Sequence, residues 1–419
     1  MSKPPYSPAS GYNVLMLAPT MFFADYGAHV RILEEATSLR ELGHQITILA
    51  YPNGRDIAGL RVVRCWGVPF NYRIIVGSSR HKLYLDAMLA LKSLPMMARV
   101  KPDLIHAHLH EGGLIGAVLS RIWHVPLVLD FQGSMTSEML DHHFLSPESA
   151  FLKPLRWLEE QIDRCPDAVI TSSHNAARLL CTQFGCREDR VHTISDCVDP
   201  DTFRPDAVTP EERIALRARY GIPEDAQVVI YLGILQDYQG IPHLIHAARR
   251  VIEEQPSTYF LIMGFPNQAR YRALAESLGV GHRVLLPGQV PYEQTPAHLS
   301  IGDIAAAPKL SATEGAAKLL YYMSTALPIV AFDTPVSREY LGELGLCAEP
   351  GSVEGLADSI LALLREPEQA RWRGQQLRRR VLERYTWTQG GQRIADVYQK
   401  VCPRPRSMLQ SRSVPSMHG

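Results

Sequence analysis

The chain has 419 residues, of which 46% are hydrophobic and 21% are charged. Those fractions are typical of a globular protein, and the length exceeds what one hydrophobic core usually serves, which predicts two domains. The 43 Lys and Arg residues balance the 43 Asp and Glu residues, so the formal net charge is +0. A balanced charge argues against a protein that binds nucleic acid mainly by electrostatic attraction.

Seven cysteines are scattered along the chain, and none forms a Cys-x-x-Cys pair. This predicts reduced thiols in a cytoplasmic protein and argues against a structural zinc site. Residues 1–11 are rich in Pro and Ser and lack the apolar segment of a signal peptide, and residues 403–419 are rich in Pro, Ser and Arg. Both ends are predicted to be disordered. No run of about 18 apolar residues occurs, so no transmembrane helix is expected.

The first half of the chain alternates between short apolar runs and segments with helical periodicity. A helix is expected over Val30–Leu42, where apolar residues recur on one face and Gly43 follows. The predicted strands are Asn13–Ala18, Gln45–Ala50, Leu104–Ala107, Leu127–Asp130 and Ala168–Thr171. This β-α-β order predicts a parallel sheet with helices on both faces.

The alternation stops at residues 198–210, VDPDTFRPDAVTP, where prolines and aspartates indicate a linker. It then resumes. Strands are expected at Val228–Leu232, Tyr259–Met263, Val284–Leu286, Ile304–Ala306 and Ile329–Phe332. Helices are expected at Pro242–Glu254, Ala269–Ser277, Val353–Arg365, Glu368–Arg384 and Thr388–Val401. The pattern predicts two doubly wound α/β domains, 12–207 and 208–384, with a cleft between them. Small-molecule sites in such sheets lie at the carboxyl ends of the strands.

Two loops of the second half are suited to a phosphate-bearing ligand. The first strand of the chain is not followed by G-x-G-x-x-G, which argues against a dinucleotide-dependent oxidoreductase. In the second domain, Gly233–Gly240 (GILQDYQG) and Ser311–Lys318 (SATEGAAK) each join a strand to a helix. The second loop opens a helix that we expect to begin near Glu314, and a helix N-terminus presents unpaired N–H groups to an anion. The same residues are equally consistent with simple helix capping by Thr313 or Glu314.

The chain as a whole resembles the family 4 glycosyltransferases, from Tyr12 to Val401. The segments that carry the resemblance include "LGHQITILA", "KPDLIHAHLH…PLVLDFQGS", "ISDCVDPDTFRP", "VVIYLGILQDYQGIPHLIHA", "LPIVAFDTPVSREYLGELG" and "VLERYTWTQGGQRIADVY". The resemblance implies a GT-B fold, in which two Rossmann-like domains face a central cleft and a terminal segment, 385–402, crosses back to the first domain. It also implies transfer of a sugar from a nucleotide diphosphate-sugar with retention at the anomeric carbon, without a bound metal or other cofactor, in polysaccharide or glycolipid biosynthesis.

The resemblance places the donor against the second domain. Its diphosphate is expected on the backbone of Gly315, Ala316 and Ala317 with Lys318 alongside, and Glu314 is expected to orient the sugar. The family's glycines persist at Gly27, Gly233 and Gly240. They permit close approach of backbone to ligand.

The departures from the family pattern also fall on the donor site. The Arg and Lys that grip the diphosphate in the family are Ile234 and Gln239 here, and each lost charge-assisted hydrogen bond is worth about 1.5–3 kcal/mol. Tyr321 stands where the family has a ribose-binding glutamate, and Gln132 where it has a histidine. A tyrosine cannot hold two ribose hydroxyls as a carboxylate does, and Tyr321 is equally consistent with core packing.

These departures from the family pattern are compatible with three functions. One is a divergent transferase with a rebuilt donor site, which the polar replacements favour. The others are a GT-B protein that binds a nucleotide or sugar without transferring it, and a GT-B sugar-nucleotide epimerase.

The acceptor side is less defined. His106, His108 and His110 alternate at the end of a strand, and period two would place all three on one side if the strand continues through them. The three histidines could form a metal site, but the resemblance instead makes His108 part of the cleft wall. The predicted catalytic residues are therefore Glu314, Gln132 and His108. The acceptor is a carbohydrate, a lipid or a small molecule. The basic, amphipathic segment Lys82–Lys101 is expected to pack on the first domain, with peripheral contact to the inner membrane face as the alternative if the acceptor is a lipid.

Overall fold

A computed structural model describes residues 11–25, 27–67, 82–141, 144–311 and 315–403. The chain divides into two compact units, which we describe separately. The first comprises Met1–Ala24, Ala28–Ser195 and Trp387–Gly419, and the second comprises Asp25–Gly27 and Asp196–Thr386. Residues 196–207, assigned above to the first domain, therefore lie in the second unit. The disorder expected for residues 1–11 and 403–419 falls, apart from residues 11 and 403, outside the described residues.

The first unit contains a seven-stranded parallel sheet in the order β3-β2-β1-β4-β5-β6-β7. Its strands are β1 Asn13–Ala18, β2 Gln45–Ala50, β3 Arg61–Arg64, β4 Leu104–His108, β5 Leu127–Phe131, β6 Ala168–Thr171 and β7 Val191–Thr193. Its helices are α1 Gly27–Glu41, α2 Lys82–Val100, α3 Leu109–Trp123, α4 Met135–Asp141, α5 Leu152–Arg164, α6 His174–Thr182 and α15 Trp387–Val401. The sheet order reverses between β1 and β4, the usual position of a ligand site in such sheets.

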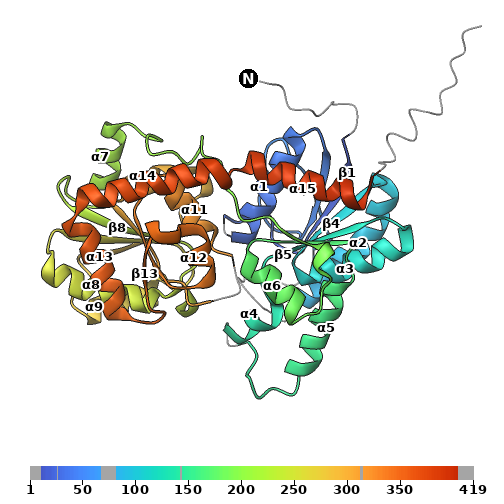
Figure 1. The fold of residues 1–419 in the computed structure, drawn as a ribbon, viewed down its shortest axis with the longest axis horizontal. Helices are drawn as coiled ribbons and strands as arrows, with labels where there is room; N and C mark the ends of the chain where they lie inside the picture. Colours follow the sequence, from blue (N-terminus) through green and yellow to red (C-terminus); the bar gives the residue numbers. More distant parts are fainter. Residues whose placement is uncertain (1–10, 26, 68–81, 142–143, 312–314, 404–419) are drawn as a thin grey trace, which may run out of the picture. The chain divides into compact units, whose positions relative to one another are not determined.

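The second unit contains a six-stranded parallel sheet in the order β10-β9-β8-β11-β12-β13. Its strands are β8 Gln227–Leu232, β9 Thr258–Met263, β10 Val284–Gly288, β11 Ile304–Ala307, β12 Ile329–Phe332 and β13 Leu346–Ala348. Its helices are α7 Pro210–Arg219, α8 Ile241–Glu254, α9 Gln268–Ser277, α10 Thr295–Ser300, α11 Ala317–Ser324, α12 Pro335–Leu341, α13 Val353–Arg365 and α14 Pro367–Arg384. Figure 1 shows the strands of each unit enclosed by helices.

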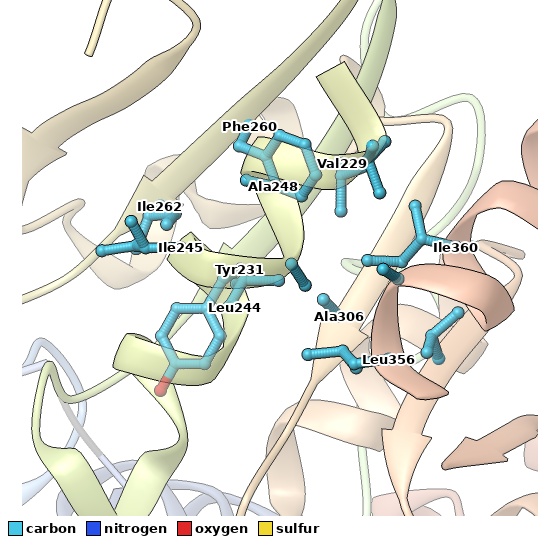
Figure 2. Packing of buried hydrophobic residues seen from close by; sticks show 14 of the residues in the cluster. Val229, Tyr231, Leu244, Ile245, Ala248, Phe260, Ile262, Ala306, Leu356 and Ile360 are labelled. Atoms are coloured by element: carbon cyan, nitrogen blue, oxygen red, sulfur yellow. The ribbon is translucent and has the colours of Figure 1, made fainter. Parts of the chain in front are cut away.

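The hydrophobic core of the second unit lies between the sheet and two of its helices. Figure 2 shows side chains of β8 and β9 packed with those of α8 and α13, among them Val229, Phe260, Leu244 and Ile360. These residues are fully buried, because a parallel sheet covered by helices has no solvent-facing side. Tyr231 belongs to the same cluster, and its hydroxyl points out of it.

Three strands were not predicted from the sequence. β3 has the sequence RVVR and β7 the sequence VHT, and both lie at edges of the first sheet, whereas β13 has the sequence LCA and lies at an edge of the second. Edge strands bury less surface than central ones, so their sequences lack the long continuous apolar run by which the other strands are identified. In the part of the chain that the structure describes, no helix combines the length and apolarity needed to cross a membrane.

Candidate functional site

The two glycine-containing loops predicted to bind phosphate meet in the second unit. Lys318, in the first turn of α11, donates hydrogen bonds from Nζ to the Tyr231 hydroxyl and to Oε1 of Gln239, both at 2.8 Å. The same ammonium lies 4.2 Å from the centroid of the Tyr231 ring. A Cβ atom at Gly233 would come within 2.8 Å of it. The loop after β8 thus lies against the start of α11.

Gly240 is required by close packing as well as by its backbone conformation. Its φ is +76°, and a Cβ atom there would come within 1.8 Å of the Pro308 carbonyl oxygen. Gly240 is the N-cap of α8, and Pro308 directly follows β11. A side chain at Gly240 would therefore push the start of α8 away from the segment that follows β11. Gly27, by contrast, is exposed at the start of α1, where a Cβ atom would meet nothing within 4 Å.

A small hollow lies beside Lys318, at the carboxyl ends of β11 and β12, and its lining combines apolar and polar residues. Lys309 is buried in its wall and donates a hydrogen bond from Nζ to the Gly315 carbonyl at 2.7 Å, which holds the loop before α11. The polar residues that line the hollow are Lys309, Ser311, Lys318, Thr334 and Ser337. Two ammonium groups and several hydroxyls around a small space favour an anionic ligand. The contribution of Thr334 and Ser337 was missed, although a Thr-Pro pair at a helix start signals a cap.

The helix of this site starts later than predicted. α11 begins at Ala317, because Ala316 is its N-cap with φ −129° and ψ 48°. Ala316 lines the hollow, and Gly315 lies in the loop before the helix. Glu314, predicted to orient the donor sugar, and Thr313 lie outside the described residues.

The two tyrosines of α11 have different surroundings. Tyr322 is fully buried, and its hydroxyl accepts a hydrogen bond from the backbone N–H of Leu232 at 2.7 Å. It therefore fixes α11 to the end of β8. Tyr321 is buried and stacks on Phe203, with ring centroids 4.6 Å apart, and meets Tyr292 edge to face. These contacts favour the packing role for Tyr321, and its predicted contact with the donor stays a prediction.

In the first unit, a buried carboxylate joins the predicted acceptor-side residues. Asp130, at the end of β5, accepts hydrogen bonds from Arg31 at 2.8 Å and from Nε2 of Gln132 at 2.7 Å, and it lies 3.2 Å from Nδ1 of His108. Burial opposes its charge, but Arg31 and His108 hold the pKa of this carboxyl well below its usual range. Asp130 is thus an anion that positions Gln132, whose side chain is half-buried.

His108, predicted to form part of the cleft wall, is surrounded by other side chains of the first unit, and its contact with a substrate stays a prediction. It is fully buried, contacts Asp130, and stacks on His106 with ring centroids 4.5 Å apart. In this structure it is therefore a positioning residue for Asp130. His106 is also buried, and its Nδ1 lies 2.7 Å from the Tyr398 hydroxyl, which joins α15 to β4.

The prediction that three alternating histidines share one side is wrong for His110. β4 ends at His108, and Leu109 adopts φ +59° as the first residue of α3. This change of backbone direction sends His110 to α5, where it approaches Asp163. The following residue, Glu111, pairs with Lys82 of α2 at 3.2 Å.

Two doubly wound parallel sheets, one of them with two lysines at its strand ends, are typical of α/β proteins that bind nucleotides. Comparisons with known proteins narrow this class. Residues 26–197 match the family model described as "Glycosyl transferase 4-like domain", and residues 212–380 match "Glycosyl transferases group 1". The chain belongs to the family 4 glycosyltransferases and is a transferase that uses nucleotide-sugar donors.

Relatives match over nearly the whole chain. A D-inositol 3-phosphate glycosyltransferase of Xylanimonas cellulosilytica is 27% identical over 426 residues, covering 96% of this chain and 95% of the relative. An alpha-D-kanosaminyltransferase of Streptomyces kanamyceticus is 26% identical over 71% of this chain and 77% of its own. Among solved structures, the sucrose-phosphate synthase of Thermosynechococcus elongatus has a TM-score of 0.77 at 19% identity, covering 92% of this chain and 98% of its own. Anabaena HepE with UDP-glucose has a TM-score of 0.74 at 18% identity, covering 92% and 99%. The fold is therefore GT-B, as predicted.

Proposed function

We propose that the protein transfers a sugar from a nucleotide diphosphate-sugar to a hydroxyl-bearing acceptor with retention of configuration. The observation that best supports the donor site is the contact of Lys318 with Gln239 and Gly233 beside the small hollow. There the ammonium of Lys318 takes over the role of the two family cations that Ile234 and Gln239 replace. Gln239 holds that ammonium instead of carrying a charge itself.

The chemistry follows from charge at the leaving group. When the bond between the anomeric carbon and the diphosphate breaks, negative charge grows on the diphosphate oxygens. Lys318 and the N–H groups at the start of α11 stabilise that charge, which lowers the barrier. Glu314 orients the sugar, and Gln132, held by Asp130, donates or accepts a hydrogen bond at a sugar hydroxyl. The transfer step itself uses no metal cofactor, so added Mg²⁺ leaves the rate unchanged.

A screen of donors tests this function. UDP, GDP and ADP and their sugars are added to the protein, and the shift in melting temperature identifies the base that binds. UDP-glucose is the first sugar to test, because it is bound in the structure of Anabaena HepE. Consumption of the sugar nucleotide with release of the nucleoside diphosphate supports a transferase. Conversion into an isomeric sugar nucleotide supports an epimerase, and binding without turnover supports the degenerate alternative.

We further propose that the acceptor is presented at a membrane surface that α2 contacts. One face of α2 is buried through Leu85, Leu89 and Met97, as packing on the first unit requires. The other face exposes Leu83, at 73% of its surface, and Tyr84, at 62%. Its basic residues are Lys82, Lys92 and Arg99, and Lys101 directly follows the helix. Lys82 pairs with Glu111, so Lys92, Arg99 and Lys101 are the charges that complement anionic lipid.

Vesicle co-sedimentation tests this contact. The protein should pellet with vesicles of phosphatidylcholine and phosphatidylglycerol, and less with phosphatidylcholine alone. The double variant Leu83→Ser/Tyr84→Ser should stay in the supernatant. A matched variant of another exposed pair, Ile214→Ser on α7 with Trp372→Ser on α14, should pellet like the wild type. Equal pelleting of both variants would remove α2 as the contact.

A further inference from the structure

A buried cluster of three side chains joins α3 to α5 in the first unit. His110 lies in the first turn of α3, and Glu159 and Asp163 are four residues apart on α5, so they share one helix face. Their exposed fractions are 6%, 0% and 1%. The cluster lies outside the predicted donor and acceptor residues, and the proposed transfer reaction does not use it.

The two carboxylates of the cluster can carry more negative charge than the described side chains around them neutralise. Both oxygens of Asp163 and Oε1 of Glu159 have no hydrogen-bond partner among the described residues, and neither has Nε2 of His110. The other oxygen of Glu159 accepts from the backbone N–H of Thr136. In the part of the chain that the structure describes, no lysine or arginine pairs with either carboxylate. An ionised carboxylate buried without compensation is strongly unfavourable, so either a proton or a metal cation is expected beside it. Burial accordingly raises the pKa of Asp163.

The spacing of the ligand atoms fits a small divalent ion. Nε2 of His110 lies 3.3 Å from Oδ1 of Asp163 and 3.7 Å from Oε1 of Glu159, and one ligand atom from each residue lies within 4.8 Å of the others. A tetrahedral ion with bonds of about 2.1 Å to nitrogen and oxygen separates its ligands by about 3.4 Å. One imidazole and two carboxylates form a ligand set that Zn²⁺ and Mn²⁺ accept.

A second group of buried ligands in the same unit lacks the charge excess. Glu35, His106 and His108 also lie within reach of one ion. There, however, Arg31 lies 3.0 Å from Glu35 and also pairs with Asp130, so an arginine already compensates the carboxylates. The cluster of His110 differs in that no lysine or arginine among the described residues pairs with it, and one imidazole faces two carboxylates.

We propose that His110, Glu159 and Asp163 bind one divalent transition-metal ion that fastens α3 to α5. A water molecule or the second oxygen of Asp163 completes the coordination. The ion is structural, and it also steadies Glu159, which holds the first turn of α4 just after Gln132 and Gly133. The competing occupant is a proton: burial lowers the pKa of His110, but Asp163 and Glu159 outweigh it and raise the pKa to about 9.

Zinc binding to the chelator-stripped, full-length protein tests the proposal. Equilibrium dialysis against buffered Zn²⁺, followed by elemental analysis, should find one ion per chain. Asp163→Asn and His110→Asn should each weaken binding by more than the roughly 10–100-fold that loss of an outer-shell partner causes. The matched control is Glu160→Gln, because Glu160 is the neighbouring carboxylate on α5 and pairs with Arg164 instead. It should bind Zn²⁺ as the wild type does.

X-ray absorption at the zinc edge identifies the atoms that bind the ion in the wild type, so it tests the site even if a ligand variant fails to fold. Nitrogen and oxygen neighbours at about 2.0–2.2 Å support the site, whereas a shell of sulfur at about 2.3 Å would assign the ion to cysteines and overturn it. The proposal also fails if the wild type binds no stoichiometric Zn²⁺, which would leave the proton as occupant, or if both ligand variants retain wild-type affinity.

Discussion

Replacing Lys318 by methionine removes one ammonium from the candidate donor site and keeps an unbranched chain of similar length over the Tyr231 ring. The side chain lies 4.2 Å from that ring, so the apolar stem still has a surface to pack on. The Tyr231 hydroxyl also donates a hydrogen bond to the Ile234 carbonyl at 2.9 Å, which the substitution leaves in place. Fold stability should therefore fall by only about 1 kcal/mol.

The loss of nucleotide affinity should be larger than the loss of stability. A hydrogen bond from an ammonium to a phosphate oxygen is worth about 1.5–3 kcal/mol. Because 1.4 kcal/mol corresponds to a tenfold change, the nucleoside diphosphate should bind roughly 10–150-fold more weakly. The family's Arg and Lys are Ile234 and Gln239 here, so neither of those positions supplies a charge that could conceal the effect.

Isothermal titration with the preferred nucleoside diphosphate measures the effect. The matched control is Arg283→Met, because Arg283 also lies over a tyrosine ring, 4.4 Å from the centroid of Tyr259. Tyr259 is at the amino end of β9, whereas Tyr231 is at the carboxyl end of β8. The control should bind like the wild type. If Lys318→Met binds within twofold of the wild type, the diphosphate does not lie at α11 and the reasoning is refuted.

Three further predictions concern stability and pH, each measured by urea unfolding. Gly240→Ala should lower the free energy of unfolding by at least about 2 kcal/mol, because the new Cβ atom meets the Pro308 carbonyl. The control Gly279→Ala has the same φ of +76° but nothing within 4 Å, so it should cost only about 1 kcal/mol. Equal losses would exclude the clash with Pro308. Asp130→Asn should lower the free energy of unfolding by about 3–5 kcal/mol, because it leaves the buried Arg31 partly uncompensated. The control Asp333→Asn removes an exposed ion pair and should cost under about 1 kcal/mol. A small loss for Asp130→Asn would contradict the role of Asp130 as the buried partner of Arg31. Burial lowers the pKa of His29 to about 3, so the unfolded chain takes up a proton between pH 6.5 and 3 that the native state refuses. The stability this histidine contributes above pH 6.5, roughly 5 kcal/mol, should vanish as the pH falls to 3, and His29→Asn should flatten that part of the pH profile.

The order of the chain's elements could be predicted from the sequence alone. Continuous apolar runs such as Asn13–Ala18 and Ile329–Phe332 are strands with the predicted bounds, because both faces of a central parallel strand are buried and every position must be apolar. Helical periodicity identified Val353–Arg365 in the same way. From these elements and the motifs between them, the sequence predicted two doubly wound sheets and the glycosyltransferase family.

Contacts between distant residues could be decided only by the tertiary structure. The sequence proposed both loops of the donor site, but the bond between Lys318 and Gln239 spans 79 residues and exists because β8 and β11 are neighbours in the sheet. Likewise, one left-handed residue, Leu109, sends His110 away from the other two histidines and toward α5. Periodicity in the sequence indicates which face of a helix or strand is apolar. A site depends instead on which elements the fold brings together, and the packing of the whole unit determines which elements are neighbours.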